Sequence, residues 1–360
     1  MALEHFQIPR YILFGPEALE QAPQALTKIG LRGKALVISG GGATAKIADR
    51  FCSILEDSRV EASRFTVESR IADVAEVLEA SRVAEREKTR FVLAVGGGRI
   101  IDVGKLVAAN LGQPYVSVPT SASHDGIASP SVSFLLKRSA MKAGIDVSRL
   151  TPPLGIIADT KVISSAPPIT FRSGCGDILA KVTAIRDWKL AHKLKGERYS
   201  EYAAAISRLS FDLIKQHAHE LKPGEEKSSR LLVKTLIGSG VAIGIAGSSR
   251  PASGSEHMFS HALDLLSMRE GYSPAPHGIQ VALGTIMMAY LHELDWMEVR
   301  RLAKAIGLPV TAREAGIPSD LVVEALTMAH RIRNRYTILG ETGLTREAAE
   351  ELARSTMVID

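Results

Sequence analysis

Cysteine is scarce in this chain: the 360 residues include only Cys52 and Cys175. Two thiols are too few for a disulfide scaffold or for a structural zinc site built from thiolates. No apolar run reaches the roughly 18 residues that a membrane-spanning helix needs, and the first residues show no basic region followed by an apolar stretch. These absences predict a cytoplasmic protein without membrane insertion.

Charge of one sign is not concentrated anywhere along the chain. The 44 Lys and Arg residues and the 39 Asp and Glu residues leave a net charge of +5. No Lys/Arg run of the kind used to bind nucleic acid occurs. We interpret these charges as solvated surface and expect no nucleic-acid partner. The length and the hydrophobic content of 46% favour a globular protein of two domains.

The first part of the chain alternates short β-branched runs with helical stretches. This pattern is typical of a parallel sheet whose strands are joined by crossover helices. The strands are expected at 34–40, 60–67, 91–98, 115–120 and 154–163, and the helices at 43–55, 71–86 and 100–111. The prediction is a Rossmann-like α/β domain over residues 1–165 that binds a dinucleotide.

The strand signal stops at about residue 171, and helical spacing follows. Breakers such as Pro223-Gly224 and Pro274-Ala275-Pro276 fall where helices should end. The helices are expected at 178–193, 199–219, 228–247, 256–267, 279–292, 297–305, 319–333 and 345–358. The prediction is an all-α C-terminal domain over residues 166–360.

A glycine turn follows the third predicted strand. Residues 96–98 are all glycine, and a helix that contains Asp102 comes next. Glycine lets the backbone approach a diphosphate closely, and the free amides at the start of a helix then face the phosphate oxygens. The turn is neither a Walker loop nor a GxGxxG motif. Close packing of strand against helix is the alternative interpretation, so the turn alone only favours a nucleotide site.

A second glycine run, at residues 40–42, follows the first predicted strand, where doubly wound sheets receive the adenosine end of a dinucleotide. The strand ends with Ser39 and not with an acidic residue. With no carboxylate there to repel a 2′-phosphate, NADP should be accepted beside NAD. An acidic residue that arrives from another part of the chain would reverse this expectation.

The fourth strand leads into a loop, Pro119 to Pro130, that is crowded with small hydroxyls and also carries His124 and Asp125. Loops at the carboxyl ends of strands are where open α/β sheets bind ligands. Each of these residues taken singly is also common in an Asx or Ser turn. The loop as a whole favours a functional role.

Histidines and one aspartate have the pattern of a metal site. His257 and His261 are one helical turn apart, and His277 follows a proline-rich segment at the start of another helix. Asp177 is expected to open the first helix of the second domain. One carboxylate and two imidazoles would leave a fourth position open, as catalytic zinc requires. A structural histidine pair and a helix-capping role for Asp177 are the alternatives.

Taken in order, these motifs resemble one enzyme family. They are the glycine turn, PTSASHDGIASP, SGCGDILAK, EHMFSHALD and Pro276-His277-Gly278. The chain is similar over nearly its whole length to the sn-glycerol-1-phosphate dehydrogenases, a family of the glycerol dehydrogenase and iron-containing alcohol dehydrogenase superfamily. Dehydroquinate synthase is a relative of this superfamily in fold, so the resemblance implies a dehydroquinate synthase-like architecture.

The resemblance also implies roles for individual residues. Asp177, His257 and His277 match the metal ligands. Asp125 and His261 match substrate contacts and are the expected catalytic residues, and Asp177 is expected to touch the substrate too. The matches for NAD or NADP contacts are Gly97, Gly98, Asp102, Thr120, Ser123 and Ser129.

The activity implied by the resemblance is the reversible NAD(P)H-dependent reduction of glycerone phosphate (dihydroxyacetone phosphate) to sn-glycerol 1-phosphate. In this family the product is the backbone of archaeal-type membrane phospholipids. One zinc ion per chain is implied, although carboxylate and imidazole also suit iron. A homo-oligomer is expected. The sequence does not identify the residues that hold the substrate phosphate.

Three other functions stay open on the sequence. One is a glycerol dehydrogenase that acts on an unphosphorylated polyol. Another is a lyase like dehydroquinate synthase, which should carry a Glu-bearing metal segment where this chain has Asp177. The third is a binding protein without activity, which the joint presence of Asp177, His257 and His277 disfavours.

Overall fold

The computed structural model describes residues 5–69 and 73–360. The chain forms two compact units, one of Met1–Pro167 with Gly224–Ile245 and the other of Pro168–Pro223 with Ala246–Asp360. The predicted boundary after residue 165 falls close to the first of these transitions. The segment 224–245, which we expected in the second domain, belongs instead to the first unit.

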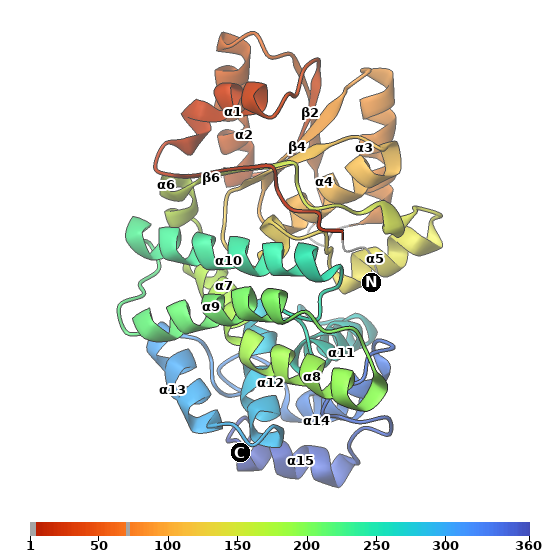
Figure 1. Cartoon of the computed structure of the whole chain (residues 1–360), viewed down its shortest axis with the longest axis vertical. Coiled ribbons are helices and arrows are strands. Elements are labelled where there is room, and N and C mark those ends of the chain that lie inside the picture. Colours follow the sequence, from red (N-terminus) through yellow and green to blue (C-terminus); the bar gives the residue numbers. More distant parts are fainter. Residues whose placement is uncertain (1–4, 70–72) are drawn as a thin grey trace. The chain divides into compact units, whose positions relative to one another are not determined.

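The first unit is built on a six-stranded parallel sheet (Figure 1). Its strand order is β1 (Tyr11–Gly15), β6 (Gly155–Asp159), β5 (Tyr115–Pro119), β4 (Phe91–Gly96), β2 (Ala35–Gly40) and β3 (Ala62–Val67). Its helices are α1 (Ala22–Lys28), α2 (Ala43–Asp57), α3 (Val74–Arg86), α4 (Gly98–Leu111), α5 (Phe134–Lys142), α6 (Thr160–Ser164) and α10 (Glu226–Ala246). The predicted Rossmann-like α/β fold is confirmed.

The two faces of the sheet carry separate apolar cores, because side chains alternate along a strand. On β2, Val37 belongs to the core that contains Phe51 and Leu55 of α2. Ile38 belongs to the core on the opposite face, with Leu106 of α4. Each such side chain contributes roughly 1.5–3 kcal/mol when it is fully buried. The central strands β2, β4 and β5 are therefore buried throughout and mostly apolar, as in a sheet covered on both faces.

The structure differs from the expected elements at several ends. The edge strand β1 was not predicted, and the strand expected over 154–163 ends at Asp159. There the Asp159 side chain accepts hydrogen bonds from the backbone amides of Lys161 and Val162, and so begins helix α6. Of the helix expected over 71–86, residues 71 and 72 lie outside the described residues, and α3 begins at Val74.

Helix α10 is long and apolar enough to cross a membrane by length and composition, which the sequence did not lead us to expect. Its most apolar window is 67% buried. A Cβ added at Gly240 would lie 2.6 Å from Ala128 Cβ, and one at Gly244 would lie 2.3 Å from the carbonyl oxygen of Gln7. Helix α10 therefore packs closely against other segments of the first unit.

The second unit is helical. Its helices are α7 (Pro168–Leu179), α8 (Lys181–Lys195), α9 (Glu201–His217), α11 (Ser255–Glu270), α12 (His277–Leu291), α13 (Trp296–Ile306), α14 (Ser319–Met328) and α15 (Arg346–Ser355). The helix expected over 319–333 ends early, since a 3-10 turn (Ala329–Arg331) and an irregular segment follow α14. Arg333 therefore lies in a loop.

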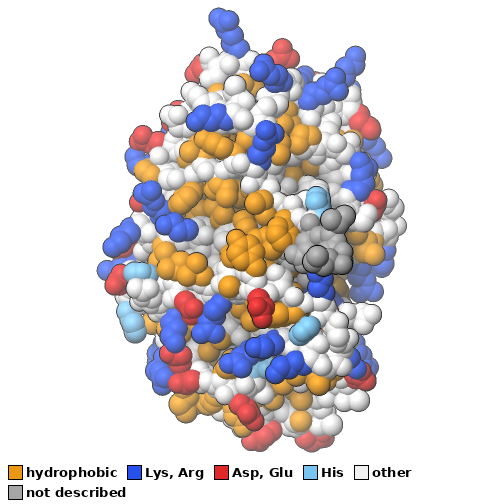
Figure 2. Space-filling view, in the orientation of Figure 1, with side chains coloured by type: hydrophobic (Ala, Val, Ile, Leu, Met, Phe, Trp, Pro, Cys, Tyr) orange, Lys and Arg blue, Asp and Glu red, His pale blue; other side chains and the backbone are white. Residues whose placement is uncertain are grey.

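Basic side chains are scattered over the face of the molecule in Figure 2, with acidic side chains among them. The exposed ion pairs of the protein include Arg208 with Asp212 and Arg269 with Glu324. Pairs of this kind contribute little to stability because water screens them. The distribution fits our interpretation of the net charge of +5 as solvated surface.

Candidate active site and metal centre

The predicted nucleotide-binding segments meet at the carboxyl edge of the sheet. Strand β4 pairs with β5 so that Gly96 faces Pro119, and the Thr120 amide donates to the Gly96 carbonyl at 3.0 Å. Strand β2 is the other neighbour of β4, with Ser39 facing Val95. The register therefore brings both glycine runs and the loop after β5 to one edge, because the strands are parallel.

The glycine turn is required by the protein's own packing. A Cβ built on Gly98 would lie 1.8 Å from His124 Nε2, and one on Gly97 would lie 3.0 Å from Ser121 Oγ. The loop after β5 thus rests on the first turn of α4. Close packing, the alternative that the sequence left open, explains Gly98 by itself. It does not compete with phosphate binding, since the amides at the start of α4 are a separate set of groups.

Two buried charges of α4 hold this loop. Lys105 is 1% exposed, and its Nζ donates to the carbonyl oxygens of Gly126, at 2.7 Å, and of Ser131. Asp102 is 2% exposed, accepts from the Ser133 amide at 2.8 Å and lies 3.5 Å from Lys105 Nζ. Burial lowers the pKa of Lys105, while Asp102 opposes that shift. Asp102, which we predicted as a cofactor contact, is thus also a structural anchor.

The other predicted residues of the first unit lie along the same loop. Asp125 begins a short 3-10 turn (Asp125–Ile127), and its Oδ2 accepts from Ser239 Oγ of α10 at 2.6 Å. Ser129 is fully buried, and its Oγ accepts from the Ser131 amide at 3.3 Å. Thr120 is 7% exposed, and Ser123 is half-buried. Ser239 was not singled out from the sequence, since a serine inside an apolar helix carries no signal.

In the second unit, two glycines decide where the metal-ligating side chains lie. A Cβ on Gly176 of α7 would lie 2.1 Å from the Gly278 carbonyl oxygen, and one on Gly278 of α12 would lie 1.8 Å from that of Ser173. The two helices can therefore approach only because both residues are glycine. Their neighbours Asp177 and His277 are brought together as a result.

The expected position of Asp177 at the start of a helix is wrong. It lies in the last turn of α7, which begins at Pro168, so it does not cap an N-terminus. The run Ser-Gly-Cys-Gly precedes it in the sequence. The helix continues through both glycines of that run, and Gly176 makes the close approach to α12.

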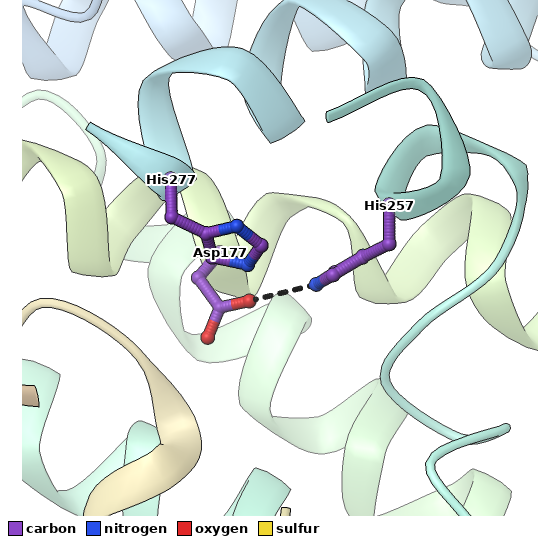
Figure 3. Close-up of side chains that lie close together, drawn as sticks. All are labelled: Asp177, His257 and His277. Atoms are coloured by element: carbon purple, nitrogen blue, oxygen red, sulfur yellow. Dashed lines mark ion pairs between the residues drawn. The ribbon is translucent and has the colours of Figure 1, made fainter. Parts of the chain in front are cut away.

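Asp177, His257 and His277 converge in the second unit (Figure 3). One oxygen or nitrogen from each can be chosen so that all three atoms lie within 4.8 Å of one another. His257 Nε2 is 3.4 Å from Asp177 Oδ1, and the imidazole centroids of His257 and His277 are 5.1 Å apart. Asp177 is 1% exposed and His257 is 6% exposed. The three residues predicted as ligands thus form one compact group.

A buried carboxylate orients His257. Glu256 is 0% exposed, and its Oε1 lies 2.8 Å from His257 Nδ1. The same carboxylate accepts from the Gly254 amide at 2.6 Å and from Thr183 Oγ1 at 2.8 Å. Since the carboxylate can only accept, Nδ1 carries the proton and Nε2 is left to face Asp177.

A polar chain plays the same part for His277. Its Nδ1 is 3.2 Å from Ser260 Oγ, and that hydroxyl donates to Gln280 Oε1 at 2.9 Å. Gln280 Nε2 in turn donates to Asp264 and to the Ala275 carbonyl. Because the Ser260 proton is committed to Gln280, His277 Nδ1 donates and its Nε2 carries the lone pair. Neither Glu256 nor Gln280 was identified from the sequence, although Glu256 adjoins His257.

The electrostatic environment suits a cation. Burial would raise the pKa of Asp177, but Lys181 and the histidines hold that pKa well below its usual value, so the side chain is a carboxylate. Burial, and then the charge of His257, hold the pKa of His277 well below its usual value. Burial lowers the pKa of His257, but Asp177 and Glu256 outweigh it and raise the pKa overall. A metal ion would take the place of that proton.

The donor set fits a catalytic metal. It offers one carboxylate oxygen and two imidazole nitrogens, both nitrogens being fixed by partners on the opposite side of the ring. Lys181 Nζ, 3.1 Å from Asp177 Oδ1 and 3.2 Å from the Ala252 carbonyl, orients the carboxylate. Iron suits the same set as well as zinc does.

His261 lies beside the three ligands, and its partner was not predicted. Its ring centroid is 5.8 Å from that of His277, and its Nε2 is 2.8 Å from Arg333 Nη2. A guanidinium can only donate, so His261 Nε2 accepts and Nδ1 carries the proton, 3.6 Å from Asp264 Oδ2. Burial, and then the charge of Arg333, hold the pKa of His261 well below its usual value. The sequence predicted Arg333 at a helix end, with no role.

The fold of this chain is shared with a known class of enzymes. A family model described as iron-containing alcohol dehydrogenase matches residues 13–167. A sulfoacetaldehyde reductase from Bifidobacterium kashiwanohense, solved in complex with NAD+, has the same fold. Its TM-score is 0.74 at 16% identity over 100% of both chains. The fold is that of the iron-containing alcohol dehydrogenases, which is dehydroquinate synthase-like.

Curated relatives narrow the class to one family. A protein from Korarchaeum cryptofilum named glycerol-1-phosphate dehydrogenase (NAD(P)+) is 58% identical over 284 residues, which are 79% of this chain and 90% of that protein. A protein of the same name from Thermococcus kodakarensis is 47% identical over 354 residues, 98% of both chains. This chain belongs to the glycerol-1-phosphate dehydrogenase family.

Proposed function

We propose that this protein catalyses the reversible reduction of glycerone phosphate to sn-glycerol 1-phosphate with NADH or NADPH. The observation that carries the proposal is the cluster of Asp177, His257 and His277. The chain that holds it is 47% identical, over 98% of its length, to a protein named glycerol-1-phosphate dehydrogenase (NAD(P)+). In this family the product supplies the glycerol backbone of archaeal-type membrane phospholipids. We expect a homo-oligomer that acts in the cytoplasm, which sedimentation and cell fractionation would test.

The residues of the second unit bind and orient the reacting carbonyl. Asp177, His257 and His277 hold one zinc ion, and Glu256 and Ser260 keep the two imidazole Nε2 atoms directed at it. When bound, such an ion polarises a carbonyl oxygen and stabilises the negative charge that develops there. Asp177 also touches the substrate. Burial of the cluster excludes water and strengthens these electrostatic interactions.

The residues of the first unit bind the nicotinamide cofactor at the carboxyl edge of the sheet. The amides at the start of α4, next to Gly97 and Gly98, face the diphosphate. Asp102 and Lys105 hold the loop that carries Thr120, Ser123 and Ser129 in place for the nicotinamide end. NADH or NADPH bound by these residues would supply the hydride for the reduction.

The reduction also requires a proton at the substrate oxygen. His261 is neutral and carries its proton at Nδ1, and Asp125 is held by Ser239 in the first unit. Both side chains contact the substrate in this proposal. The proton comes from solvent through a substrate hydroxyl or a water, and His261 and Asp125 orient that relay.

The test compares NADH and NADPH oxidation by the zinc-loaded enzyme with glycerone phosphate and with glycerone. Two charge-assisted contacts to the phosphate should make kcat/KM at least about a hundredfold higher for glycerone phosphate. A chiral assay should identify sn-glycerol 1-phosphate as the product. Equal efficiency with both substrates would indicate a polyol dehydrogenase, and an sn-3 product would contradict the proposed orientation of hydride transfer.

A further inference from the structure

The guanidinium of Arg333, in the second unit, lies beside His261. Arg333 is half-buried in the loop after the 3-10 turn, and its Nη2 donates to His261 Nε2 at 2.8 Å. His261 in turn has its ring centroid 5.8 Å from that of His277 and 6.3 Å from that of His257. The positive charge of Arg333 therefore lies one side chain away from the metal-ligating cluster.

The loop that carries Arg333 is fixed in place. Arg335 donates to the Ser253 carbonyl, and to Ser249 Oγ at 2.9 Å. Arg250 Nη1 donates to the Tyr336 carbonyl at 2.8 Å, while its Nε donates to Glu197 at 2.7 Å. Two arginines therefore tie residues 335 and 336 to the segment 249–253. The backbone next to Arg333 is thereby fixed, so less entropy is lost when the Arg333 side chain binds a ligand.

The charges around this loop favour an anion. Burial lowers the pKa of Arg333 to about 10. Burial, and then the charges of Arg333 and Arg250, lower the pKa of Arg335 to about 9, although Glu197 and Glu256 oppose this. Two half-buried guanidinium groups that disfavour each other are stabilised by a dianion placed against one of them.

We propose that Arg333 binds the phosphate of the substrate, by N–H donors other than the one directed at His261. This inference rests on the proposed function, since it takes the carbonyl to lie at the metal cluster and the phosphate beside it. A guanidinium has five N–H donors in one plane, so it can serve His261 and two phosphate oxygens together. Arg335 is a positioning residue in this account, because its guanidinium holds the loop.

The experiment separates phosphate binding from catalysis at the carbonyl. Arg333→Gln should lower kcat/KM for glycerone phosphate by about ten- to a hundredfold, as for the loss of one charge-assisted contact. Its kcat/KM for glycerone should fall by a clearly smaller factor, because that substrate has no phosphate and is affected only through the lost contact of Arg333 with His261. Inorganic phosphite should activate glycerone reduction by the parent enzyme and not by the variant.

Matched variants keep the result interpretable. Arg331→Gln removes the same charge two residues away, from an exposed side chain, and should change neither substrate's kcat/KM. Arg333→Lys should recover part of the glycerone phosphate activity, since an ammonium keeps the charge but not the fork geometry. If Arg333→Gln unfolds, the Lys variant and inhibition of the parent by inorganic phosphate still supply the comparison.

The experiment distinguishes a failure of the proposed function from a failure of the role proposed for Arg333. If the parent enzyme uses glycerone and glycerone phosphate equally well, the proposed function is wrong. If the parent prefers glycerone phosphate and Arg333→Gln keeps that preference, or loses activity with both substrates in equal measure, Arg333 does not bind the phosphate. Equal loss would mean that it acts only by holding His261.

Discussion

The two units of this protein hold their functional residues in different ways. At the carboxyl edge of the sheet, the side chains of Asp102 and Lys105 hold a loop, and the groups that we propose for a diphosphate are backbone amides. In the second unit, three side chains converge, and further residues orient their rings. A dinucleotide site can thus be built from backbone and packing, whereas a metal site needs particular side chains at particular atoms.

The largest effect should follow from removal of a metal ligand. His277→Ala should abolish zinc binding and lower kcat/KM roughly a thousandfold or more, because several kcal/mol of charge stabilisation are lost. The measurements are zinc content by elemental analysis and NADH oxidation. Chelation of the parent should have the same effect, and added zinc should reverse it. The exposed His219→Ala is the control. Full activity of a zinc-free protein would refute the metal site.

A change in the first unit should act on stability and cofactor binding and leave the metal alone. Lys105→Met removes a buried ammonium that serves two carbonyls and Asp102, which should cost about 3 kcal/mol of unfolding free energy. The KM for NAD(P)H should rise, while zinc content stays at one per chain. Denaturant titration and steady-state kinetics check both. Loss of zinc in this variant would mean that the two sites depend on each other.

Zinc affinity should depend on the carboxylate behind His257. Glu256→Gln should weaken zinc binding about ten- to a hundredfold, since Nδ1 loses the charged acceptor that fixes its ring. Competition with a chromogenic chelator would measure the change. Glu270→Gln, at the C-terminal end of the same helix, is the matched control. Unchanged affinity would show that the backbone alone positions His257.

Acid should destabilise the metal-free protein through buried histidines. The pKa values of His261 and His277 are held well below the usual value, chiefly by burial. Near pH 6.5 the unfolded chain takes up protons that the folded chain does not, so the stability present above that pH is lost as pH falls. The raised pKa of His257 acts weakly in the opposite direction. We expect a loss of about 1–2 kcal/mol between pH 6.5 and 5.5 by denaturant titration, and a smaller loss in His261→Gln.

The smallest effect concerns the choice between NADH and NADPH. Ser39 is fully buried in β2, whereas Gly41 in the following turn is exposed, and a Cβ there would meet nothing within 4 Å. Gly41→Asp should shift preference toward NADH by roughly tenfold through repulsion of the 2′-phosphate. Gly41→Asn, with the same shape and no charge, is the control. An equal change with Asn would mean that the effect is steric.

Much of the first unit could be predicted from the sequence. Strands β2, β4 and β5 are mostly apolar runs, whereas β3 mixes polar and apolar residues. The pattern placed the ends of these four strands to within about two residues. Strand β1, a short strand at an edge of the sheet, was not predicted, because so short an apolar run does not distinguish a strand from part of a helix. The segment 224–245 was predicted as one more helix of the second domain, but it belongs to the first unit. Helical periodicity shows which residues form the apolar face of a helix, but it does not show which elements that face packs against.

The candidate site, like the fold, was predicted from the sequence only in part. The residue types were readable, since Asp177, His257 and His277 carry metal-ligating groups in spacings that resemble a known family. The assignment of catalytic, cofactor and substrate roles to them, and to Asp125 and His261, stays a prediction. Glu256, Gln280 and Lys105 were not found, because a polar residue inside a helix has the same appearance whether it faces water or a buried partner.

The sequence by itself determined the alternating α/β pattern, the helical second half and the set of candidate ligands, because these depend on local periodicity and on the chemistry of single side chains. Only the tertiary structure decided that Asp177 lies in the last turn of α7 and that it meets His277. The reason is the contact of Gly176 with Gly278, which lie far apart in the sequence. Because neither residue has a side chain, helices α7 and α12 can touch there. The position of Arg333 beside His261 was decided in the same way, by packing that no local pattern encodes.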